Sequence, residues 1–243
     1  MSSTDSTGSP SAAEFDEFAD DYDAALDRGL ALTGESKTYF AEGRLKWLAG
    51  CLQKLGYEAG SCLDFGCGTG TAAPFISQLL GISEITGVDP SEDSLEVARA
   101  DNESLGASYK NTASFGDSEA FDLAYCNGVF HHIPLLERAA AVGQVFRALR
   151  PGAYFSLWEN NAWNPVTRYL MSRVPFDKDA ILLWPRGARR MLREAGFEIV
   201  RTDFAFIFPG ALKFLRFLEA PLHKLPLGGQ YQILARKPNT ASP

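Results

Sequence analysis

Two neighbouring histidines are the residues of this 243-residue chain best suited to proton-transfer chemistry. His131 and His132 are two of only three histidines, and they lie shortly after an apolar run at 121–126. Imidazole is the natural proton acceptor near neutral pH. Adjacent side chains on an extended chain point to opposite sides, so we expect at most one of them to be a general base. The alternative role for both is structural, through hydrogen bonds to loop carbonyls.

Asp64 lies before a turn that has glycines at positions 66, 68 and 70. An apolar lead-in and an apolar-periodic stretch from Thr71 flank the turn, which predicts a strand, a tight turn and a helix. Glycine lets the backbone approach a ligand closely and adopt positive φ, and a helix start offers unpaired N–H groups. The stretch therefore predicts the nucleotide-binding corner of a doubly wound α/β sheet.

A second acid, Asp89, ends the next apolar run and lies nineteen residues beyond Gly70. An acid at this place in the fold binds the hydroxyls of a ribose. Residues 68–73 also satisfy the G-x-G-x-x-A pattern, so spacing alone leaves an NAD(P)-dependent oxidoreductase open. The chain contains no Tyr-x-x-x-Lys pair for such an oxidoreductase.

Alternating strands and helices are predicted for the rest of the chain. We expect helices at 35–55, 91–105, 134–149 and 185–196, and strands at 107–112, 121–126, 153–158, 197–206 and 230–236. Ser91 is the expected N-cap of its helix, and Arg150 to Gly152 are expected to end the helix before them. Ligands in open α/β sheets bind at the carboxyl ends of the strands, where Asp64, Asp89 and the histidines are expected.

Three motifs occur in order: Asp64-x-Gly66-x-Gly68-x-Gly70, then Gly87-Val88-Asp89-Pro90-Ser91, then the stretch 121–133 with its paired histidines. Over about residues 15–237 the sequence resembles the class I S-adenosylmethionine (SAM)-dependent methyltransferases that act on small molecules. The resemblance implies a Rossmann-like, mostly parallel seven-stranded sheet with helices on both faces. It also implies an antiparallel last strand beside strand six, which the simple NAD fold lacks, and an N-terminal helical lid.

The resemblance implies a cofactor site for SAM, and for its product S-adenosylhomocysteine (SAH). Asp89 would hold the ribose, Asp64 the amino end of the cofactor, and Asn127 the methionine end. In the family, an Asp near the end of the third strand usually accepts a hydrogen bond from the adenine amino group. Residues 111–114 of this chain read Asn-Thr-Ala-Ser. Thr112, a backbone group or Asp117 would therefore take the place of that Asp. The full set of implied cofactor residues is Tyr22, Arg44, Asp64, Gly66, Cys67, Gly68, Asp89, Pro90, Thr112 and Asn127.

Two of these cofactor residues have an alternative role. Tyr22 would reach the cofactor from the lid or only pack its ring against the core. Arg44 would meet the cofactor's carboxylate or lie on the surface.

The acceptor of the methyl group is less defined by the sequence. Glu159, Asn160 and Trp163 follow strand five and are the polar and aromatic candidates for orienting it. The apolar residues around 204–218 would line a pocket for an apolar or lipid-like acceptor, or form ordinary core, which we favour.

Charge and composition exclude several partner classes. The net charge is −7, and residues 1–27 carry eight acids and no base, which leaves +1 for residues 28–243. No basic stripe indicates nucleic acid, and we interpret Arg189, Arg190 and Arg193 as a solvated helix face. No apolar run approaches the roughly 20 residues of a membrane span, although contact with a membrane surface stays open. The four cysteines show no metal-ligand spacing, and we expect a cytoplasmic protein without metal.

The predicted organisation is a disordered tail at 1–13, a helical lid segment at 14–56, and a methyltransferase domain at 57–237 followed by a tail at 238–243. An insertion is expected at about 160–184. The predicted function is methyl transfer from SAM to an oxygen or nitrogen nucleophile of a small molecule by in-line displacement. The alternatives are an NAD(P)-dependent oxidoreductase and a SAM-binding protein without catalysis.

Overall fold

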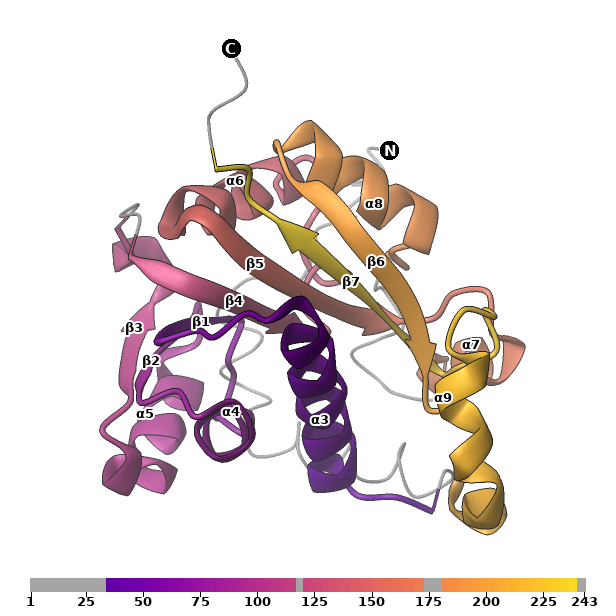
Figure 1. Ribbon diagram of the computed structural model, residues 1–243. Coiled ribbons are helices and arrows are strands. Elements are labelled where there is room, and N and C mark those ends of the chain that lie inside the picture. The colour runs from indigo at the N-terminus through magenta and orange to yellow at the C-terminus, as the bar shows by residue number, and fades with distance from the viewer. Residues whose placement is uncertain (1–33, 117–119, 173–180, 240–243) are drawn as a thin grey trace, which may run out of the picture.

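A seven-stranded sheet forms the centre of the molecule, with the strand order β3-β2-β1-β4-β5-β7-β6 (Figure 1). The computed structural model describes residues 34–116, 120–172 and 181–239. The predicted tail at 1–13, residues 14–33 of the predicted lid with Tyr22, Asp117, part of the insertion and residues 240–243 lie outside the described residues. No helix in the described ranges is long and apolar enough to cross a membrane.

The first five strands and β6 run in one direction, and β7 runs against them. The strands are β1 (Ser61–Phe65), β2 (Glu84–Asp89), β3 (Ser108–Asn111), β4 (Phe121–Asn127), β5 (Leu149–Asn160), β6 (Glu198–Ala205) and β7 (Gln230–Arg236). β1 pairs in parallel with β2 and β4, whereas β7 pairs antiparallel with both β5 and β6. The predicted Rossmann-like sheet with an antiparallel last strand beside strand six is confirmed.

Helices cover both faces of the sheet and close two apolar cores. They are α3 (Lys37–Leu55), α4 (Ala73–Leu80), α5 (Glu92–Asp101), α6 (Arg138–Ala148), α7 (Pro165–Met171), α8 (Pro185–Glu194) and α9 (Glu219–Leu222). On one face α3 and α4 bury Leu45, Leu48 and Ile76. On the other face α6 and α8 bury Val142 and Leu192. Because both faces are covered, the central strands are buried along almost their whole length.

Local side-chain caps explain where the helices begin and end. The Ser36 hydroxyl accepts a hydrogen bond from the Tyr39 N–H and caps α3, and Ser91 caps α5 as predicted by accepting from Ser94. The helix predicted to run to Leu105 ends earlier, at Asp101. The buried Asn102 amide donates to the carbonyls of Ala98 and Gly70, and a short 3-10 turn follows.

The start of β5 and the segment after β6 differ from the prediction. Arg150 to Gly152 were expected to separate helix from strand, but β5 already begins at Leu149. The Gly152 N–H donates to the Lys237 carbonyl, which extends the pairing with the end of the chain. Segment 210–218 was interpreted as core, and that is wrong. It forms 3-10 turns with no buried residue, and Phe214 and Phe217 are 68% and 73% exposed.

Candidate functional site

The glycine turn after β1 is tied to β2 by three backbone N–H groups. The N–H groups of Gly66 and Cys67 both donate to the Val88 carbonyl, and the Gly68 N–H donates to the Asp89 carboxylate at 2.9 Å. Gly66 has φ +72°, and a Cβ there would overlap the Val129 side chain. Gly68 has φ +50°, and a Cβ there would meet nothing within 4 Å. The turn is therefore open at the Gly68 Cα, while the N–H groups of Gly66, Cys67 and Gly68 donate to β2.

Asp89 fixes the end of β2 to the turn and to the next helix. One carboxylate oxygen accepts from Gly68, and the other accepts from the Ser91 N–H at 3.0 Å. A carboxylate can accept about four hydrogen bonds, so this anchoring is compatible with binding the hydroxyls of a ribose. The half-buried position of Asp89 at the carboxyl end of β2 suits that role.

Asp64 is the most unusual carboxyl group of this edge of the sheet. Its side chain lies on β1 and is 3% exposed. Burial, together with the nearby charge of Asp89, raises the pKa of Asp64 to about 7, against a smaller lowering by Arg44. No hydrogen bond to its carboxylate comes from the described residues. A cationic donor supplied by a ligand would therefore be strongly favoured here.

Arg44 approaches this carboxyl from α3 and is buried, so its interpretation as a surface residue is wrong. It is 7% exposed. Its Nε donates to the Tyr125 hydroxyl at 3.2 Å and its Nη1 to the Gln230 side chain at 3.0 Å. A guanidinium has five N–H donors, so two recorded bonds leave capacity for a ligand carboxylate.

His131 forms a buried pair with Glu159. His131 Nδ1 lies 2.6 Å from Glu159 Oε2, and the other Glu159 oxygen accepts from the Phe130 N–H at 2.9 Å. The His131 carbonyl accepts from the Ile181 N–H. The His132 ring lies 4.0 Å from that of His131 and is half-buried. The Glu159 carboxylate thus fixes the orientation of the His131 ring.

The three candidates for the acceptor do not lie together. Glu159 is 2% exposed and engages His131 and Phe130, so it supports the histidine rather than facing an open space. Asn160 is half-buried beside Gln230, whose amide donates to it at 3.4 Å. Trp163 is 39% exposed and lies against Phe204 of β6, with 5.9 Å between ring centroids.

The remaining predicted cofactor residues lie around the turn and the neighbouring strand ends. Asn127 ends β4 and is half-buried. Thr112 follows the last residue of β3, and Pro90 is exposed directly after Asp89. Burial raises the pKa of the Cys67 thiol above its usual value, which disfavours the thiolate form. These residues share one edge of the sheet with Asp64 and Asp89 because β1, β2 and β4 are parallel.

Two sets of contacts at the site were missed by sequence reasoning. Tyr125 and Gln230 hold Arg44, and Glu159 holds His131. The only signal for the second contact was an acid at the end of the strand that follows a histidine loop. No sequence pattern pointed to the first.

Comparison with known sequences identifies a methyltransferase domain. Residues 63–155 match the family model described as a methyltransferase domain. A trans-aconitate 2-methyltransferase of Methylobacterium radiotolerans is 30% identical over 138 residues, which are 56% of this chain and 52% of that protein. The chain thus spans about half the length of this relative.

Solved structures share the architecture over nearly the whole chain. The cyclase SpnF superposes with a TM-score of 0.66 at 20% identity, covering 96% of this chain and 98% of that one. A SAM-dependent methyltransferase from Thermotoga maritima gives a TM-score of 0.63 at 20% identity, covering 92% and 98%. The likeness establishes the Rossmann-like methyltransferase fold. Since one of these structures is a cyclase, the fold by itself does not specify methyl transfer.

Proposed function

Because this chain belongs to the class I SAM-dependent methyltransferases, we propose that it transfers the methyl group of SAM to a small molecule. The acceptor atom is an oxygen or a nitrogen, and the reaction is an in-line displacement. SAM supplies a methyl group already activated by a sulfonium, so the protein contributes mainly binding, orientation and proton removal.

The observation that carries the proposal is the buried Asp64 carboxyl, which has no donor from the described residues and a pKa of about 7. SAM carries an ammonium and a sulfonium, and both are favoured beside two carboxylates. A nicotinamide dinucleotide would instead bring a diphosphate to the same turn. The N–H groups of Gly66, Cys67 and Gly68 already donate to β2, so they are not available to phosphate. The electrostatics of the turn favour SAM over NAD.

The residues at the strand ends divide the binding work. Asp89 accepts from the ribose hydroxyls while it holds the turn through Gly68. Asp64 accepts from the ammonium, and Arg44 donates to the cofactor's carboxylate. The open surface at Gly68 admits the body of the cofactor. Asn127 contributes at the methionine end.

His131 is the general base in this proposal, and Glu159 is its positioning residue. The Glu159 carboxylate at Nδ1 fixes the tautomer in which Nδ1 carries the proton, so Nε2 accepts a proton from the acceptor molecule. An acceptor that is already a carboxylate needs no base, so the contribution of His131 depends on the acceptor's chemistry.

Calorimetric titration with SAH, beside NAD(H) and NADP(H), tests the proposal. We expect SAH to bind with a Kd on the order of 1 µM and the nicotinamide nucleotides not to bind. Asp89→Ala is expected to weaken SAH binding at least about tenfold. Glu84→Gln is the matched control, because Glu84 is exposed and lies at the opposite end of β2.

Binding of a nicotinamide nucleotide in place of SAH would overturn the proposal. Unchanged SAH affinity in Asp89→Ala would remove the ribose assignment. Tight SAH binding without SAM turnover, across a panel of carboxylates, hydroxyl compounds and amines, would identify a SAM-binding protein without catalysis.

A further inference from the structure

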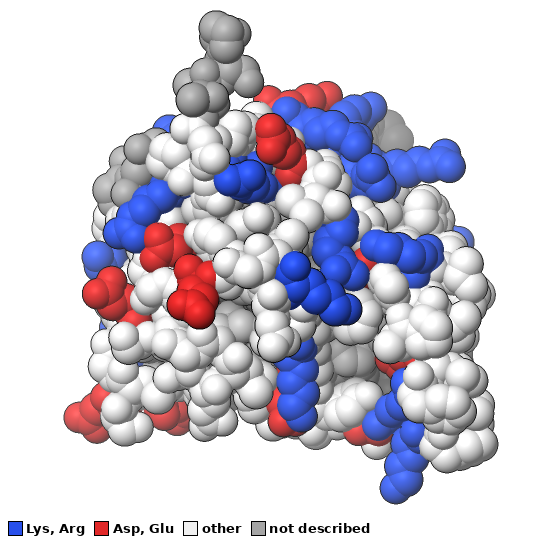
Figure 2. All heavy atoms as spheres, in the orientation of Figure 1, with Lys and Arg blue, Asp and Glu red and all other residues white. Residues whose placement is uncertain are grey.

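A hollow lies at the outer edge of the sheet, between β6 and α8, and it is strongly basic. Its volume is about 640 Å³, and five cationic side chains line it: Arg186, Arg189, Arg193, Arg201 and Lys224. Among the described residues that line it there is no acid. Figure 2 shows Lys and Arg side chains gathered over this part of the molecule. This positive surface, called here the basic hollow, belongs to a chain whose net charge is −7.

The arginines of α8 reach the hollow because of their spacing. Arg186, Arg189 and Arg193 are three and four residues apart, which places them on one side of the helix. Arg190, between them, does not line the hollow; it is exposed and lies 3.8 Å from Glu194. The interpretation of the arginines as a solvated face therefore fits the exposed Arg190 and Arg193, whereas Arg189 is half-buried.

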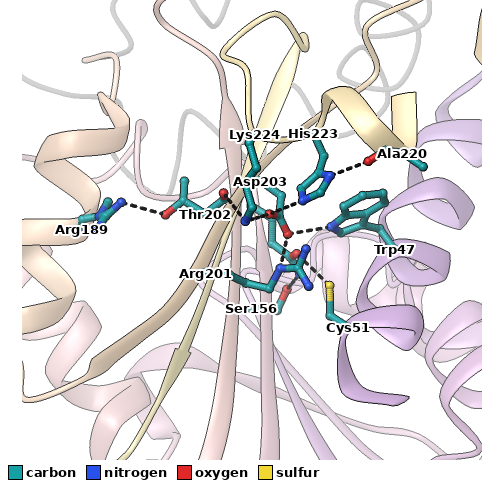
Figure 3. A network of polar contacts seen from close by, with 11 residues as sticks. Trp47, Cys51, Ser156, Arg189, Arg201, Thr202, Asp203, Ala220, His223 and Lys224 are labelled. Atoms are coloured by element: carbon teal, nitrogen blue, oxygen red, sulfur yellow. Dashed lines mark hydrogen bonds and ion pairs between the residues drawn. The ribbon is translucent and has the colours of Figure 1, made fainter. Parts of the chain in front are cut away.

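Two further cations of the hollow, Arg201 and Lys224, are held in place by the buried carboxylate of Asp203 (Figure 3). Asp203 is fully buried and accepts from Arg201 Nε at 2.5 Å, Lys224 Nζ at 2.6 Å and Trp47 Nε1 at 3.0 Å. Arg189 Nη1 meets the Thr202 hydroxyl at 3.5 Å. One carboxylate faces two cations here, so the hollow keeps an excess of positive charge after this pairing.

The edge of β6 is closed to an added peptide strand. The Thr202 carbonyl accepts from Lys224, and the Phe204 N–H donates to the His223 carbonyl, outside the pairing with β7. The pairing register also shifts between Ile199 and Arg201, as in a β-bulge. A lysine that covers an edge strand and a bulge within that strand both hinder strand addition. An extended acidic peptide is therefore a poor fit.

We propose that the basic hollow binds a small multivalent oxyanion, a molecule with two or more phosphate or carboxylate groups. Guanidinium groups match both oxyanions through paired N–H donors. The volume lies within the roughly 300–1,000 Å³ typical of small-molecule sites. At one end the Arg186 guanidinium lies 5.9 Å from the centre of the Trp163 ring, which provides a flat wall for a planar part of the ligand.

The site is distinct from the proposed cofactor site. β6 is the edge strand, and β7, β5 and β4 separate it from β1 and the glycine turn. The two sites also differ in the sign of their charge. Occupation of the basic hollow therefore needs no SAM.

Calorimetric titration with inorganic pyrophosphate, citrate and acetate tests this proposal. We expect pyrophosphate or citrate to bind saturably at one site, and the one that binds more tightly identifies the preferred oxyanion. Acetate, with a single charge, is expected not to bind. The double variant Arg189→Ala/Arg193→Ala is expected to lose at least about tenfold in affinity.

Arg190→Ala is the matched control, because it removes one charge from the same helix outside the hollow. Both variants are expected to keep the thermal midpoint and SAH affinity of the parent, which separates this site from the cofactor site. The proposal is overturned if neither pyrophosphate nor citrate binds saturably, or if Arg190→Ala loses as much affinity as the double variant. Single-stranded oligonucleotides whose affinity rises with their length would instead assign the surface to nucleic acid.

Discussion

Two buried aspartates lie far apart across the sheet, and their pKa values are shifted in opposite directions. Asp64 on β1 is 3% exposed and Asp203 on β6 is 0% exposed. Burial and the charge of Asp89 raise the pKa of Asp64 to about 7. Burial also acts to raise the pKa of Asp203, but hydrogen bonds from Arg201, Lys224 and Trp47 together outweigh it and lower the pKa.

Both carboxyls are buried, so the difference shows that the hydrogen-bond donors around Asp64 and Asp203 decide the direction of the pKa shift. Asp203 has three donors from the protein and is part of the structure. Asp64 has none from the described residues, which fits a group whose partner is a ligand. Each of the following changes tests one side of this contrast.

The largest effect is expected from Asp203→Ala. It leaves Arg201 and the part-buried Trp47 N–H without their acceptor, whereas Lys224 is 56% exposed and is rehydrated. Each part-buried donor left without an acceptor costs about 1–3 kcal/mol. Urea unfolding measures the loss. A loss below about 1 kcal/mol, within the range of an exposed pair, would show that Asp203 does not organise β6.

Asp64→Asn is expected to affect binding instead of folding. The amide cannot pair with the ammonium of SAM, so SAH affinity falls at least about tenfold, or about 1.4 kcal/mol, while stability at pH 8 stays the same or rises. Calorimetry and urea unfolding on one preparation give both values. Unchanged affinity together with a large loss of stability would make Asp64 a structural group like Asp203.

The stability difference between the parent and Asp64→Asn is expected to depend on pH. The folded pKa of about 7 lies above the usual value of 3.8 for an exposed Asp. The folded state therefore holds a proton that the unfolded state has released. The stability that this provides is present below about pH 4 and is lost as the pH rises through 7.

Thermal midpoints of both proteins from pH 4 to 8 measure this change. We expect the parent to lose stability relative to Asp64→Asn across the range. A difference that stays flat would contradict the raised pKa.

Glu159→Gln is expected to give the smallest change. Glu159 is buried and bonded like Asp203, yet it lies near the proposed reaction site. The amide keeps the shape but loses the charge at Nδ1, so the fixed tautomer of His131 is lost while SAH affinity stays within about twofold. Two-dimensional ¹H–¹⁵N spectra of the imidazole report the tautomer. An unchanged tautomer would remove Glu159 as the positioning residue.

The sequence predicted features that depend on local order along the chain. The glycine turn, the acid at the end of β2, the Ser91 cap and the bounds of β7 all follow from short patterns, and the structure has them. The contacts of Arg44 join residues 44, 125 and 230, and no local pattern encodes such a meeting. The basic hollow was missed for the same reason, because it needs α8 to lie against an edge strand and Lys224.

β7 has a consequence for the order in which the protein is made. It is the last strand among the described residues, yet it lies between β5 and β6 and pairs with both. Ribosomes add residues from the N-terminus at about 5–20 per second, so β5 and β6 both emerge before the strand that joins them.

A nascent chain that has not reached Gln230 has two unpaired strand edges, which makes it prone to aggregation. Pulse proteolysis of chains stalled before Gln230 tests this: cleavage within both strands is expected, and protection of β6 would refute it. During synthesis, the pairing of the seven-residue β7 is therefore the step that joins β6 to the rest of the sheet.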